Sequence, residues 1–206
     1  MKRKQKTILI SAVLLFSIVI IGMVIFGNIK PDYSDFKDDD VVAKVGNEKI
    51  FKKDVDNRIL SIKISNDAQK QALYNNLDKE TANSMAEKIN NPPSFEEELN
   101  NMIESAKIRE YLKQINEELT VDEAKELTDT NFLNDSTANA REIALELLKT
   151  EGITKETYMD SIYSMYYDVW CQNKLFEYFE KNMYDSNAKT TLLEQYKNYR
   201  ESVINQ

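Results

Sequence analysis

The sequence predicts a mainly α-helical protein, in which an N-terminal transmembrane helix precedes a multi-helix domain with one short β-hairpin. The chain has 206 residues, of which only 4 are Gly and 3 are Pro, so residues that favour turns are scarce. Residues 7–27 contain no charged side chain. In most of the later sequence, apolar residues recur at helical spacing.

Residues 7–27 are predicted to form a transmembrane signal anchor. A helix of 21 residues is roughly 30 Å long, which matches the hydrocarbon core of a bilayer. Residues 1–6 are basic and the first acid is Asp32, so the positive-inside rule makes 1–6 a cytoplasmic tail and places the later domain outside the cell membrane. A cleaved signal peptide is the alternative, although its apolar region is usually about 7–15 residues long. Abundant Lys, Asn and Ile fit a low-GC bacterium.

Residues 28–40 are predicted to be an acidic linker. They contain five Asp residues and reach at most about 45 Å when extended. A calcium site is the alternative interpretation of the acidic run 38–40. The Asp-x-Asp-x-Asp-Gly loop of such sites is absent, so we expect these charges to be solvated.

Residues 41–51 are predicted to form the β-hairpin. The segment is rich in Val, and Gly46 and Asn47 both tolerate the positive φ that a tight primed turn demands. A two-stranded hairpin is not stable alone, so it must pack on the helices.

The rest of the chain is predicted to be helical. Ser94 with Glu97 and Thr120 with Glu123 are capping boxes that begin two helices. Gly152 is a natural residue to end another. The expected helices lie at about 52–76, 79–90, 94–116, 137–150, 154–182 and 187–203, with one more starting at Thr120. The apolar positions expected to face the core are Val55, Ile59, Ile62 and Leu73 in the first helix, and Tyr158, Ile162, Met165, Val169, Phe176, Phe179 and Met183 in the helix at 154–182.

Four segments together resemble the N-terminal domain of SurA/PrsA-type foldases. Residues 42–50, VAKVGNEKI, resemble the opening hairpin of that domain, with the asparagine-glycine turn inverted and Phe51 in place of a Thr or Ser helix cap. Residues 99–103 (LNNMI) are similar to the second long helix of that domain, and residues 119–123 (LTVDE) to the start of the next helix. Residues 152–158 (GITKETY) are similar to the entry into its last helix, so the segments occur in the same order. The resemblance covers about 41–184.

The resemblance implies a SurA N-like domain, which we assign to residues 41–206, and an extracytoplasmic chaperone that holds unfolded exported polypeptides. Members of the family often carry a parvulin prolyl-isomerase domain after this one. About 22 residues follow Tyr184 and the chain has no His, so we expect no isomerase activity of this type. The helix at 187–203 would correspond to the final helix that packs back on the domain.

The helix at 154–182 carries the candidate client-binding residues. Tyr166 widens the expected core stripe of this helix. The other four lie about 100° round the helix from that stripe, and they are Tyr163, Tyr167, Trp170 and Tyr178. Exposed aromatic and Met-rich surfaces accept varied apolar peptides. In the alternative interpretation, the hairpin and the last helix cover this face and the rings belong to the core.

Composition argues against several other functions. From residue 28 onward the chain has 23 basic and 35 acidic residues, a net charge of −12, which argues against nucleic-acid binding. The single Cys, Cys171, excludes an intrachain disulfide and a Cys-rich zinc site, and the absence of His removes the usual general base. Acid pairs such as Glu117 and Glu118 could serve a hydrolase, but solvated helix faces are their ordinary place.

The predicted function is therefore non-enzymatic. No catalytic, cofactor or metal residue is assigned. The first candidate is a membrane-anchored chaperone-like protein that binds unfolded exported polypeptides. The alternative is a non-catalytic adaptor that binds one envelope or secretion partner.

Overall fold

The computed structural model describes residues 32–131 and 138–206. Within them, seven α-helices and one two-stranded antiparallel sheet confirm the mainly α class of the domain. In chain order the elements are η1 (Tyr33–Asp35), β1 (Val41–Val45), β2 (Glu48–Phe51), α2 (Lys52–Asn76), α3 (Lys79–Ala86), α4 (Phe95–Gln114), α5 (Val121–Asn131), α6 (Ala138–Glu151), α7 (Lys155–Asn182) and α8 (Leu192–Ile204).

The predicted span 7–27 and the basic tail 1–6 lie outside the described residues. Among the helices that are described, none combines the length and the apolar character needed to cross a bilayer.

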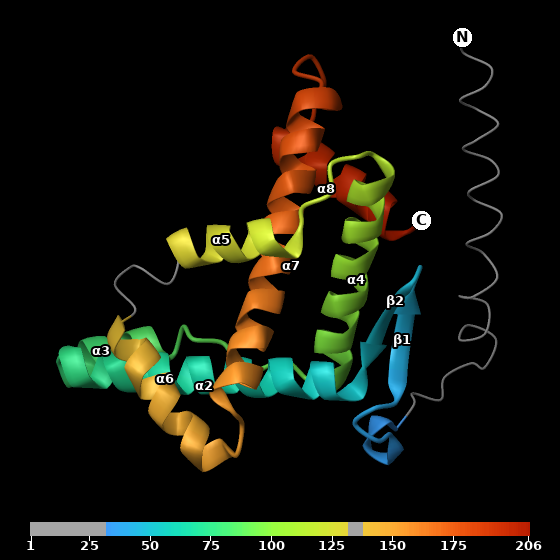
Figure 1. Ribbon diagram of the computed structural model, residues 1–206. Coiled ribbons are helices and arrows are strands. Elements are labelled where there is room, and N and C mark those ends of the chain that lie inside the picture. The colour runs from blue at the N-terminus through green and yellow to red at the C-terminus, as the bar shows by residue number, and fades with distance from the viewer. Residues whose placement is uncertain (1–31, 132–137) are drawn as a thin grey trace, which may run out of the picture.

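Helix α2 is the base on which the other elements are arranged (Figure 1). The hairpin lies at one end of α2, and α3 and α6 lie near the other end. Helices α4 and α7 rise from α2 and contact each other, and α8 packs on both of them. Helix α5 packs on α7.

The hairpin forms where the sequence predicts it, although its turn differs in detail. Val45 pairs with Glu48, which leaves Gly46 and Asn47 as the two turn residues. Only Gly46 has a positive φ, at 57°. This is the requirement of a type II′ turn, in which the second turn residue keeps an ordinary φ.

Residues 32–40, the described part of the acidic linker predicted at 28–40, make several contacts with the domain. The ring of Tyr33 lies 4.7 Å from the ring of Phe95, centroid to centroid. The Nζ atom of Lys53 lies 2.8 Å from Oδ1 of Asp39. Among the described residues, no group of three metal-binding side chains comes together, and this includes the acidic run 38–40.

Capping residues set most of the helix ends. The backbone N–H groups of Glu97 and Glu123 donate to the Ser94 and Thr120 hydroxyls, as predicted. Gly152 has a φ of 72° after α6. The expected helix at 79–90 ends at Ala86, and the one expected at 187–203 begins only at Leu192. A third capping box, formed by Thr191 and Glu194, causes the later start.

The buried faces of α2 and α7 are rotated from the expected stripes. In α2 the buried residues are Val55, Arg58, Ser61, Ile64 and Ala68, and in α7 they are Tyr158, Ser161, Asp168, Cys171, Leu175 and Phe179. Two members of the expected α7 stripe, Val169 and Met183, are exposed by 44% and 54%. The cause is a charged cluster at the centre of the domain, which takes the inward positions of both helices.

Three apolar clusters surround this centre. The first joins α2, α6 and the start of α7 around Ile64 and Leu148. The second joins the hairpin, α2 and α4 around Val55 and Leu99. The third joins α4, α7 and α8 around Ile108, with Cys171 in its interior.

Cys171 provides a test of this third cluster. Its side chain is 1% exposed, and burial raises the pKa of the thiol to about 12. We expect thiol reagents to modify native Cys171 only when the domain opens. Measured by mass spectrometry, labelling at pH 8 should be slower than in urea by several orders of magnitude, set by the free energy of unfolding.

The same thiol makes stability depend on alkaline pH. An unfolded thiol ionises near pH 8.5, whereas the folded one stays protonated to about pH 12. Stability from this group is therefore complete below about pH 8.5 and decreases as the pH rises toward 12. Rapid labelling without denaturant would contradict this burial. So would a free energy of unfolding that depends on alkaline pH in the same way in wild type and in Cys171→Ala.

Candidate functional site

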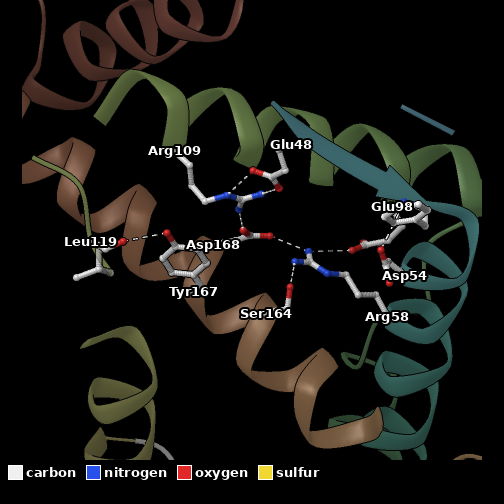
Figure 2. Close-up of polar contacts among 10 residues, drawn as sticks. Glu48, Asp54, Arg58, Glu98, Arg109, Leu119, Ser164, Tyr167 and Asp168 are labelled. Carbon is white, nitrogen blue, oxygen red and sulfur yellow. Dashed lines mark hydrogen bonds and ion pairs between the residues drawn. The ribbon is translucent and has the colours of Figure 1, made fainter. Parts of the chain in front are cut away.

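Five charged side chains form an alternating chain through the centre of the domain (Figure 2). Its order is Glu98, Arg58, Asp168, Arg109 and Glu48, so that acid and base alternate. We call this set the charge chain. Each link joins two different elements, and together the links connect the hairpin, α2, α4 and α7.

Asp168 is the central link, because its two carboxylate oxygens accept from two different guanidinium groups. Arg58 Nη1 lies 2.7 Å from Asp168 Oδ2, and Arg109 Nη1 donates to Asp168 Oδ1. Asp168 is 6% exposed and Arg58 is 5% exposed. Arg58 also donates to the Ser164 hydroxyl, at 2.5 Å, so α2 is held to α7 at two points.

Arg109 connects this centre to the hairpin. It donates from two nitrogens to the Glu48 carboxylate, with Nε 3.2 Å from Oε2. Burial alone would lower the pKa of Arg109, but the nearby Asp168 and Glu48 carboxylates outweigh it and raise that pKa. The guanidinium also lies 5.4 Å from the centre of the Tyr167 ring, a cation–π contact.

Glu98 has weaker contacts than the other acids of the charge chain. Its Oε1 is 3.5 Å from Arg58 Nη1, and its Oε2 is 3.3 Å from Asn101 Nδ2. Both distances are at or beyond the long end of ordinary hydrogen bonds. Glu98 is nevertheless only 4% exposed.

Two crevices meet at Glu98 and Asn101. The inner crevice, of about 220 Å³, lies among α2, α4, α7 and α8 and is lined by Arg58, Glu98, Asn101, Glu104, Ser105, Met165, Asp168, Gln172 and Arg200. The outer crevice, of about 900 Å³, lies between α2, the segment 88–93 and the start of α4.

Amide side chains line both crevices, whereas apolar surface lies mainly in the outer one and the inner one is lined mostly by charged residues. The amide residues are Asn66, Gln69, Asn90, Asn91, Asn101 and Gln172. Each amide both donates and accepts, so it can pair with the main chain of a bound polypeptide whatever its sequence. Ile62, Ile89, Pro92, Pro93 and Met165 supply the apolar surface.

Three of the five predicted client-binding residues face α5 and the segment before it. The Tyr163 hydroxyl donates to Asp129 Oδ1 at 2.7 Å, and the Trp170 Nε1–H group donates to the Thr128 hydroxyl at 3.2 Å. The Tyr167 hydroxyl donates to the Leu119 carbonyl at 2.9 Å, and burial raises its pKa to about 12.

The other two candidates are also half-buried. Burial raises the pKa of Tyr166, and Tyr178 lies close to Tyr199 of α8. The expected covering elements were the hairpin and the last helix, whereas α5 covers most of this face. The polar atoms of Tyr163, Tyr167 and Trp170 are therefore bonded within the domain, while their rings are partly exposed.

The charge chain was not predicted from the sequence, although one signal for it is present. Arg58 follows Val55 by three residues and precedes Ser61 by three, so a charge lies on the inward face of an amphipathic helix. Asp168 lies likewise on the face of α7 that carries Ser161 and Leu175. A buried charge needs a partner, so the pattern points to an ion pair without identifying which residues form it.

Comparisons with known proteins do not place the chain in a family. Neither the protein-family models, nor the curated proteins, nor the solved structures gave a match.

Asp168→Asn tests whether the charge chain holds the helices together. The substitution keeps the shape of the side chain but removes the charge between Arg58 and Arg109. We expect a loss of about 3–5 kcal/mol in the free energy of unfolding, since it leaves two cations without their shared acid. Urea denaturation of the full chain, followed by far-UV circular dichroism, measures this.

Asp160→Asn is the matched control, because Asp160 is exposed on the same helix. It should change stability by less than about 0.5 kcal/mol. Equal, small losses in both variants would show that the charge chain does not hold the domain together.

Proposed function

We propose that this protein is a chaperone-like, non-enzymatic protein that binds extended segments of unfolded exported polypeptides in the two joined crevices. The observation that carries the proposal is the composition of the walls. Amide groups suited to main-chain atoms lie beside apolar surface suited to varied side chains.

The resemblance of residues 41–184 to the N-terminal domain of SurA/PrsA-type foldases supports the same proposal. So does the acidic composition, which would keep the unoccupied protein soluble and favour basic clients. In this proposal, residues 7–27 anchor the protein in the membrane and the domain lies outside it.

The binding surface in this proposal differs from the aromatic face of α7. The polar atoms of Tyr163, Tyr167 and Trp170 already donate hydrogen bonds to α5 or to the Leu119 carbonyl. Both crevices are partly open to solvent. Tyr166 and Tyr178, both half-buried on α7, remain candidates for contact with a longer client.

A second candidate function is that of an adaptor for one envelope or secretion partner. The inner crevice favours it, because its walls include Arg58 and Asp168. Side chains held by buried ion pairs present a fixed shape, whereas promiscuous binders use surfaces that can repack.

Asn101→Trp tests the crevices directly. Asn101 is exposed and lines both of them, so an indole there would block their junction. We expect the full chain in lipid nanodiscs to suppress aggregation of diluted, denatured citrate synthase, measured by light scattering. The variant should do so about tenfold less effectively, a loss of ~1.4 kcal/mol in binding.

Gln114→Trp is the control, since Gln114 is exposed at the other end of α4. It should act as wild type, and circular dichroism should show the same helicity in all three proteins. If wild type fails to suppress aggregation at severalfold molar excess, holding of unfolded chains is ruled out. A single crosslinked protein, captured in cells from a photoreactive group at position 101, would then identify the adaptor function.

A further inference from the structure

The charge chain carries one more negative charge than positive charge. Its members are Glu98, Arg58, Asp168, Arg109 and Glu48, which makes three carboxylates and two guanidinium groups. Asp168 is paired with two guanidinium groups, whereas the terminal acids Glu98 and Glu48 are each paired with one. The excess negative charge therefore belongs to one of these two terminal acids.

The contacts place this excess at Glu98. At the other end, Glu48 accepts from two nitrogens of Arg109 and is partly exposed, so water shares its charge. Glu98 accepts from Arg58 at 3.5 Å and from Asn101 at 3.3 Å, and its side chain is 5% exposed. A carboxylate has about four acceptor positions, so Glu98 has unused ones in a place that bulk water barely reaches.

The other cations of the crevices do not neutralise Glu98. Arg200 pairs with Glu104 at 2.8 Å. Lys88 lines the outer crevice but makes no ion pair with Glu98 among the described residues. A buried charge without full compensation is costly, so this position favours the arrival of a cation.

We propose that the junction of the two crevices binds a Lys or Arg side chain of the held segment, with the cationic group on Glu98. This inference rests on the proposed function and specifies the class of segment that is preferred. The ammonium or guanidinium group would use the free acceptor positions of Glu98. The apolar stem would lie against the crevice walls, where Ile62 and Met165 supply apolar surface.

The test compares two labelled peptides that differ in one side chain. Each has about ten residues, roughly 33 Å when extended, and is built from Ala, Ser and Leu around one central residue. The central residue is Lys in one peptide and norleucine in the other, which keeps the stem and removes the charge. Fluorescence anisotropy with the full chain in nanodiscs gives both affinities.

We expect the Lys peptide to bind wild type about tenfold or more tightly than the norleucine peptide, the usual size of a desolvated charge pair. In Glu98→Gln this preference should fall below about twofold, because the neutral amide cannot compensate the cation. Glu110→Gln, the same change on the same helix outside both crevices, should keep the full preference.

Each other outcome overturns the inference in a distinguishable way. Equal binding of both peptides to wild type refutes the cation site but leaves the proposed function intact. A preference for Lys that persists in Glu98→Gln shows that the cation binds elsewhere. If neither peptide binds, the cation site is refuted, and the aggregation assay then decides separately whether unfolded chains are held. The comparison on wild type does not depend on how well any variant folds.

Discussion

The fold depends on the pairing of Asp168 with Arg58 and Arg109 at its centre. Guanidinium groups in an interior of low dielectric are tolerated only where carboxylates meet them in good geometry. Satisfying both cations with one carboxylate requires α2, α4 and α7 to converge at a single point. Glu48 extends the requirement to the hairpin. The two crevices lie beside this centre and meet at Glu98 and Asn101.

A charged centre of this kind contributes less stability than an apolar core, but it makes the packing of the helices more specific. An apolar core of the same volume would often be as stable or more stable, but it would tolerate helices sliding past one another. Three modest apolar clusters, rather than one large core, surround the charges. We infer that the charges fix the register of the helices while the clusters supply most of the free energy of folding.

Features that depend on neighbouring residues could be read from the sequence, and features that depend on distant ones could not. The hairpin and the caps at Ser94 and Thr120 were predicted because their determinants lie within a few residues. The charge chain joins residues up to 110 positions apart, and no local pattern says which acid meets which base. The stripes expected for α2 and α7 contained only apolar and aromatic residues, so they did not anticipate the inward positions of Arg58 and Asp168. The aromatic face of α7 was recognised as a surface, but its covering by α5 depends on tertiary packing.

The bond between Trp170 and Thr128 has a spectroscopic consequence. The chain contains one Trp, so all of its indole emission comes from a ring seated against α5. The emission maximum and its quenching by iodide or acrylamide therefore report on the seating of that helix. Trp170 lines neither crevice. Intrinsic fluorescence therefore reports movement of α5 and is a poor probe of ligand binding in the crevices.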